Sequence, residues 1–96
     1  MVGTLAPDAI EQALRDLAGW AVDGDAIVRT VRRASFRDAI ALVDRIADAA
    51  EQANHHPDLC VRGYRLLEIR LTTHSEGGIT ERDLSMARAI EGLIDS

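Results

Sequence analysis

The sequence predicts an α+β fold in which a four-stranded antiparallel sheet carries three helices on one face. Two pairs of short apolar segments are each joined by turn residues, a pattern that is typical of β-hairpins. Before, between and after these pairs, apolar residues recur at helical spacing. The resulting order is αββαββα. Strand pairs joined by turns favour an antiparallel sheet covered by helices on one side.

A chain of 96 residues is expected to form a single domain over residues 1–96, because it has no room for a second core. Only three residues are aromatic, so aliphatic side chains and alanine must fill most of the interior. A small chain buries a smaller share of its surface than a large one. We therefore expect an interface between copies of the chain to supply part of the stability.

The first helix and the first hairpin are predicted within residues 7–33. Pro7 suits a first helical turn, and Gly19 suits the end of the segment. Strands are predicted over residues 20–22 and 26–33, with the turn sequence Asp23-Gly24-Asp25 between them. The apolar positions that indicate the helix are Ile10, Ala13, Leu14 and Leu17.

The second helix is predicted to begin after Ser35, an N-cap candidate with Asp38 three residues later. It must end near His55, because Pro57 disfavours helical geometry in the residue before it. The predicted buried stripe of this helix follows helical spacing and consists of Phe36, Ile40, Val43, Ala47 and Ala50.

The second hairpin is predicted around a turn at Gly63 and Tyr64, with a third strand near Val61 and a fourth over residues 66–73. In the fourth strand, apolar and polar residues alternate, so one face should be buried. A loop over residues 75–78 leads to the last helix. Thr80 is its N-cap candidate and Asp83 its acidic partner.

Composition excludes several classes of function. The formal net charge of −5 argues against binding to a phosphate backbone, and no run is long and apolar enough for a membrane span. Residues 1–6 carry no positive charge and do not resemble a signal peptide. Cys60 is the single cysteine, which fits a reducing compartment. We therefore expect a cytoplasmic protein without nucleic acid or membrane partners.

The three histidines stand where secondary-structure elements are predicted to end. His55 and His56 lie between the second helix and the third strand, and His74 ends the fourth strand. Such joints hold side chains on rigid supports and leave them open to a ligand. Glu51 lies four residues before His55, so its carboxylate is expected to accept that imidazole's N–H and fix its tautomer. His56, held extended by Pro57, should point elsewhere.

Other interpretations of these residues remain open. The His-His-Pro sequence could serve only as a helix-end arrangement, and Asp83 is well explained as a cap. A zinc site could use the histidines with Glu51, Asp58 or Cys60. We expect no metal, because adjacent histidines diverge and neither HExxH nor CxxC occurs. Serine-based catalysis is disfavoured because the chain has no GxSxG motif.

Taken together, these residues resemble the pterin-4a-carbinolamine dehydratase family. The resemblance runs over nearly the whole chain and includes the strings Leu71-Thr72-Thr73-His74 and Gly78-Ile79-Thr80-Glu81-Arg82-Asp83. Its fixed positions follow the pattern Glu51-x3-His55-His56-Pro57-x6-Tyr64-x9-His74-x8-Asp83. The resemblance implies a saddle-like sheet that assembles into homodimers or homotetramers.

The resemblance also implies an activity, the dehydration of a 4a-hydroxytetrahydropterin to a quinonoid dihydropterin in tetrahydropterin recycling. Imidazole suits this reaction because it can act as acid or base near neutral pH. By this resemblance the catalytic groups are His55, His56 and His74, and no cofactor is needed. Which histidine is the acid stays open. The substrate-binding residues would be Pro57, Thr72, Thr73, Ser75 and Arg82, with Glu51, Tyr64 and Asp83 supporting the histidines from behind.

Two alternatives accompany this expectation. Some members of the family are dimerisation partners of a transcription factor or help to assemble other proteins, so the chain could be a non-catalytic, coactivator-like interaction module. A dehydratase that acts on a different pterin is also compatible with the residues. Three intact histidines favour an enzyme, because an adaptor has no need of them.

Overall fold

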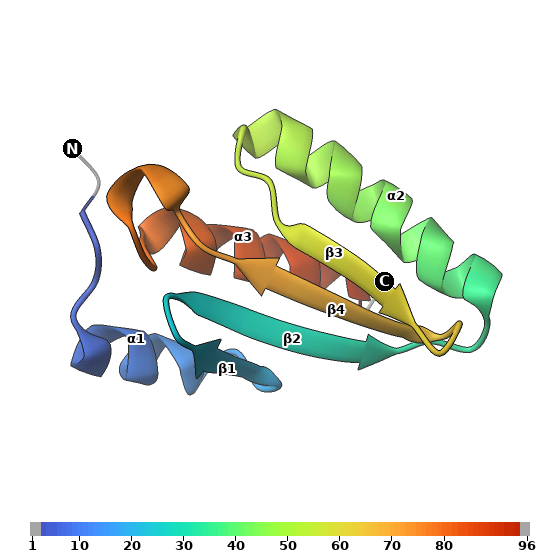
Figure 1. Ribbon diagram of the computed structural model, residues 1–96, viewed down its shortest axis with the longest axis horizontal. Coiled ribbons are helices and arrows are strands. Elements are labelled where there is room, and N and C mark those ends of the chain that lie inside the picture. The colour runs from blue at the N-terminus through green and yellow to red at the C-terminus, as the bar shows by residue number, and fades with distance from the viewer. Residues whose placement is uncertain (1–2, 95–96) are drawn as a thin grey trace.

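The computed structural model describes residues 3–94, and its elements follow the predicted order (Figure 1). The helices are α1 (Pro7–Leu14), α2 (Phe36–Ala53) and α3 (Glu81–Ile94), and the strands are β1 (Trp20–Asp23), β2 (Ala26–Arg32), β3 (Asp58–Arg62) and β4 (Leu66–Leu71). A short 3-10 turn, η1 (His74–Glu76), precedes α3. The predicted α+β class with an antiparallel sheet is confirmed.

The four strands form one antiparallel sheet in the order β1-β2-β4-β3. The two hairpins therefore meet through β2 and β4, where Ile27 pairs with Leu71 and Val31 with Leu67. The predicted alternation in β4 is confirmed, since Leu67, Ile69 and Leu71 are fully buried. The start of β3 and the end of β4 lie together at the end of the sheet away from their hairpin turn (Figure 1). At this end, β3 follows the segment after α2, and β4 leads into η1. This end of the sheet carries the histidines.

The core lies between the apolar face of the sheet and the helices. Leu42 and Ile46 of α2 and Ile90 of α3 are fully buried with Ile69 of the central strand β4. α2 and α3 contact one another, and α1 lies beside the β1–β2 hairpin (Figure 1). Among residues 3–94, no helix combines the length and apolarity needed to cross a bilayer.

The predicted buried stripe of α2 is wrong in part. Phe36 is 51% exposed and Ile40 is 39% exposed, and Ala47 is exposed as well. The neighbouring row of the helix faces the core instead, and its buried members are Ala39, Leu42, Ile46 and Ala50. The helix carries two adjacent apolar rows, both at helical spacing. The row that meets the sheet is set by tertiary packing, and periodicity alone does not distinguish it.

Some predicted boundaries shift by two or three residues. α1 ends at Leu14 and continues as irregular turns, yet Leu17 is buried as its place in the stripe implied. β4 ends at Leu71, and Thr73 forms an isolated bridge with Gly78. The predicted loop over residues 75–78 lies partly in η1. Helix and strand ends are the least fixed part of any such prediction.

The predicted N-cap of α2 is confirmed. The Ser35 hydroxyl accepts a hydrogen bond from the Asp38 backbone N–H at 3.1 Å. In return, the Asp38 carboxylate accepts one from the Ala34 backbone N–H at 3.3 Å and forms an ion pair with Arg33 at 3.1 Å. The Ala34 N–H, followed by the Arg33 guanidinium, lowers the pKa of Asp38.

This lowered pKa predicts an acid-sensitive contribution of Asp38 to stability. A group with a depressed pKa in the folded state stabilises the fold above its unfolded pKa of about 3.9 and loses that effect as the pH falls through the folded value. We expect Asp38→Asn to lower the urea midpoint at about pH 7 and to match the parent chain at about pH 2. Asp48→Asn, an exposed site on the same helix, is the control. A gap that persists in acid would contradict the role of the charge.

Candidate active site

His55, His56 and His74 line one open hollow between the end of α2, the end of β4 and η1. The hollow has a volume of about 230 Å³. Two distant stretches of chain thus bring the three predicted imidazoles to one place. Its other lining residues are Asn54, Thr72, Thr73, Ser75 and Arg82.

The end of α2 separates the two adjacent histidines. Asn54 caps the helix in the left-handed conformation, with φ of 50°, and its backbone N–H donates to the Glu51 carbonyl. The chain therefore turns sharply at the point where the histidines begin. The side chain of His55 is only 8% exposed, whereas that of His56 is 56% exposed. Sequence reasoning missed Asn54, although asparagine is the residue after glycine that best tolerates this conformation.

His55 is held by a buried carboxylate. Its Nε2 lies 2.5 Å from Oδ1 of Asp83, which is fully buried in the first turn of α3. An ionised carboxylate only accepts hydrogen bonds, so Nε2 carries the hydrogen. Within residues 3–94, Nδ1 of His55 has no hydrogen-bond partner. In the neutral ring, Nδ1 therefore presents a lone pair.

The other oxygen of Asp83 is fixed by a directed chain of hydrogen bonds. Oδ2 accepts from the Thr80 backbone N–H at 2.9 Å and from the Thr73 hydroxyl at 2.9 Å. Since Thr73 uses its one hydrogen on Asp83, the Thr80 hydroxyl must donate to Thr73 across 2.8 Å. Thr80 in turn accepts from the Arg82 backbone N–H. Asp83 therefore both caps α3, as predicted, and orients His55.

The predicted partner of Glu51 is wrong. Glu51 contacts His56 instead, with 2.5 Å between its Oε2 and the Nε2 of that ring. The expectation assumed that the helix continues to His55, but α2 ends at Ala53. After the left-handed turn, the extended chain at His56 returns beside Glu51. Both side chains are exposed, that of His56 by 56% and that of Glu51 by 75%.

His74 reaches the hollow from the far end of β4. It opens η1 and is exposed, and its ring makes no hydrogen bond among the described residues. The turn is closed by Gly77, whose φ is 74° and whose N–H donates to the Thr73 carbonyl. Glycine adopts this conformation without strain. The backbone of the turn, and no side-chain partner, thus positions His74.

The predicted binding residues differ in what they offer. Arg82 donates from Nη2 to the Asn54 carbonyl at 2.7 Å, and the Thr72 hydroxyl donates to the Asp25 carbonyl at 2.6 Å. Thr73 is buried, and its hydroxyl is engaged with Asp83. Ser75 lines the hollow on its exposed rim. Pro57 follows His56 but does not line the hollow.

Tyr64 does not lie near the histidines, and the expectation that it supports them is wrong. It sits in the β3–β4 turn, at the opposite end of that hairpin from His56 and His74. Its side chain is 60% exposed, and its ring lies 5.7 Å from the guanidinium of Arg65. Its φ of 56° belongs to the turn itself. The fixed spacing of Tyr64 from the histidines in the sequence therefore reflects its place in the β3–β4 turn.

The hollow contains proton-transfer groups in three different settings. One imidazole is buried and fixed by a carboxylate, one is exposed and paired, and one is exposed and unpaired. Within residues 3–94, no three His, Cys, Asp or Glu side chains are grouped closely enough to hold a metal ion. Such an arrangement can supply an acid and a base to one ligand at the same time.

Comparisons with known proteins found relatives that match nearly the whole chain. A protein of Nocardia farcinica, provisionally named pterin-4-alpha-carbinolamine dehydratase, is 52% identical over 93% of each chain. A protein of Thermomicrobium roseum with the same provisional name is 48% identical over 88% of this chain and 89% of its own. The crystal structure of a transcriptional coactivator/pterin dehydratase from Brucella melitensis has a TM-score of 0.89 and 36% identity, covering 96% of this chain and 99% of its own.

A more distant solved structure shares the fold alone. It is a pterin dehydratase-like protein identified as a RuBisCO assembly factor in the alpha-carboxysome, with a TM-score of 0.63 and 19% identity over 80% of this chain and 88% of its own. The sequence model of one family matches residues 3–93, nearly the whole chain. With the relatives above, this match shows that the chain belongs to the Pterin 4 alpha carbinolamine dehydratase family.

Proposed function

We propose that this protein is a cytoplasmic hydro-lyase that converts a 4a-hydroxytetrahydropterin to the quinonoid dihydropterin and water. The observation that carries the proposal is the convergence of three imidazoles on one open hollow, with the tautomer of one of them fixed by a buried carboxylate. Membership of the family supports the pterin as substrate. Neither a metal nor a redox cofactor is required by the reaction.

The reaction needs one proton delivered and one removed. The C4a–O bond breaks, its electron pair leaves with oxygen, and an acid supplies the proton that completes water. The N5–H bond gives its electron pair to the new C4a=N5 double bond, and its proton passes to a base. Positioned proton transfer of this kind accelerates reactions by about 10²–10⁴-fold.

The three settings suggest a division of roles. His55 suits the base, because Asp83 holds the hydrogen on Nε2 and leaves the Nδ1 lone pair free for the N5 proton. His56 and His74 are exposed on the rim and suit proton delivery to the leaving hydroxyl, which must escape as water. Glu51 contacts Nε2 of His56 on the exposed rim and orients that ring.

Replacing each histidine by alanine tests the proposal. We expect His55→Ala, His56→Ala and His74→Ala each to lower turnover of a freshly generated carbinolamine, by about 10²-fold or more for His55. The measurement is the ultraviolet absorbance change as the carbinolamine disappears. Tyr64→Phe, at the far hairpin tip, is the control and should not change the rate. Full activity in all three variants would reject the site, and loss of activity with a chelator would indicate a metal.

A second candidate function is that of a protein-binding partner. Its support is the exposed apolar row of α2, where Phe36 and Ile40 line a shallow hollow of about 460 Å³ with no covering element among residues 3–94. The Brucella relative is named both coactivator and dehydratase. The same row would serve a homodimer or homotetramer, since exposed apolar patches commonly mark interfaces. If the purified, folded chain does not accelerate carbinolamine dehydration, that result would favour this second function.

A further inference from the structure

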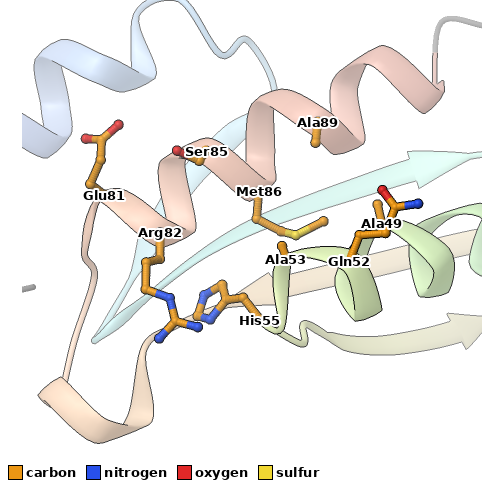
Figure 2. Close-up of a pocket in the computed structure, with 9 residues that line it drawn as sticks. All are labelled: Ala49, Gln52, Ala53, His55, Glu81, Arg82, Ser85, Met86 and Ala89. Atoms are coloured by element: carbon orange, nitrogen blue, oxygen red, sulfur yellow. The ribbon is translucent and has the colours of Figure 1, made fainter.

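A larger hollow lies between α2 and α3 and shares His55 with the proposed catalytic hollow. Its volume is about 610 Å³. Figure 2 shows its side chains, which come from the last turns of α2, from His55 just after that helix, and from residues 81–89 of α3. Small residues on both helices leave the space open, with Ala49 and Ala53 on α2 and Ser85 and Ala89 on α3. Met86, which is 3% exposed, also lines it.

The two hollows meet at two shared residues, His55 and Arg82. Arg82 extends from the first turn of α3 and donates to the Asn54 carbonyl at the end of α2, and Figure 2 shows it with His55 among the side chains that line the larger hollow. A ligand that contacts His55 from the smaller hollow is therefore adjacent to the larger one. The larger hollow is therefore a neighbour of the proposed site, with His55 and Arg82 at the boundary between them.

The sizes of the hollows differ in a way that matters for a substituted substrate. Pockets that enclose a drug-sized ligand measure roughly 300–1,000 Å³. The hollow at the three histidines, at about 230 Å³, falls below this range and suits the bicyclic pterin ring alone. The hollow between the helices, at about 610 Å³, falls within it. A pterin with a long substituent must place that substituent outside the catalytic hollow.

The chemistry of the ring directs the substituent toward the junction. In a pterin, N5 is bonded to both C4a and C6, and natural pterins carry their side chain on C6. If His55 accepts the N5 proton, C6 lies one bond from that atom, and its substituent begins beside the residue that both hollows share.

We infer that the hollow between α2 and α3 is the binding subsite for the C6 substituent and that it favours an extended, largely apolar group such as an aryl ring. This inference rests on the proposed function. The apolar lining of Ala49, Ala53, Met86 and Ala89 gives a flat ring contact area. Gln52 and Ser85 on the exposed rim can hydrogen-bond polar atoms farther along the substituent.

Filling the subsite tests the inference. Ala53→Leu and Ala89→Leu place a larger side chain in the hollow from two different helices, at exposed positions where the fold tolerates it. The substrates are the carbinolamines of 6-phenyl- and 6-methyl-tetrahydropterin. We expect each variant to lower kcat/KM for the phenyl substrate by about tenfold or more while changing that of the methyl substrate by less than about twofold. Ala47→Leu, exposed on α2 but outside the hollow, is the control.

A binding measurement separates this inference from the proposed function. Calorimetry with the unreactive 6-phenylpterin and 6-methylpterin should show weaker binding of the phenyl compound alone to Ala53→Leu and Ala89→Leu. Equal losses for both compounds, or no loss for either, would overturn the subsite. Absence of turnover with selective weakening of phenyl binding would reject the dehydratase and retain the subsite. Turnover of the methyl substrate, with phenyl binding not selectively weakened in the variants, would retain the dehydratase and reject the subsite.

Discussion

Asp83→Asn is expected to lower kcat by about 10²–10⁴-fold with a much smaller change in KM. The Thr80 backbone N–H and the Thr73 hydroxyl both donate to Oδ2 of Asp83, so the amide oxygen of an asparagine must occupy that position. The amide nitrogen then faces Nε2 of His55 and donates to it. This moves the ring hydrogen to Nδ1 and removes the lone pair that the proposed base requires.

Single-turnover kinetics with the 6-methyl carbinolamine would measure this effect separately from binding. Because Asp83 also caps α3, the control must lose a cap without touching a histidine. Ser35→Ala removes the N-cap hydrogen bond of α2 and should cost about 1 kcal/mol of stability with unchanged kcat. A folded Asp83→Asn variant with the parent's kcat would show that the tautomer of His55 is irrelevant to the rate.

Leu42→Ala is expected to lower the free energy of unfolding by about 2–5 kcal/mol. Leu42 is fully buried on the face of α2 that packs against the sheet, so alanine leaves a cavity in a small core. Ile40, two residues earlier, is 39% exposed. Ile40→Ala should cost less than about 1 kcal/mol in the monomer, because solvent can fill the space that it leaves.

Urea denaturation checks this difference at a protein concentration where size-exclusion chromatography shows a single chain. The condition matters because Ile40 would contribute more if copies of the chain associate through its face. Similar losses for both variants in the monomer would contradict the assigned orientation of α2. Comparing Leu42→Ala with Ile40→Ala also shows which of the two apolar rows of α2 packs against the sheet.

The architecture could be predicted because local signals agree with one another along the chain. The alternation in β4, the cap at Ser35 and the turn at Gly24 each depend on a few neighbouring residues, and the structure confirms them. The three histidines could be selected because they fall at the ends of elements, and those ends meet at one end of the sheet.

The partners of the histidines could not be predicted, because they depend on tertiary geometry. Asp83 is 28 residues from His55 in the chain and reaches it only after α3 packs beside the end of α2. Glu51 was matched to the wrong ring because the helix ends two residues before His55. The hollow between α2 and α3 has no motif, since it arises from the small side chains that face each other across two helices.

The left-handed conformation of Asn54 gives the two adjacent imidazoles different exposure to solvent. The two side chains are chemically identical, so only the path of the main chain decides which one is sheltered and which one meets water. We expect the insertion or deletion of a single residue between Glu51 and Pro57 to separate both rings from their carboxylate partners without altering any functional group. The length of this segment therefore constrains the site as strictly as its composition does.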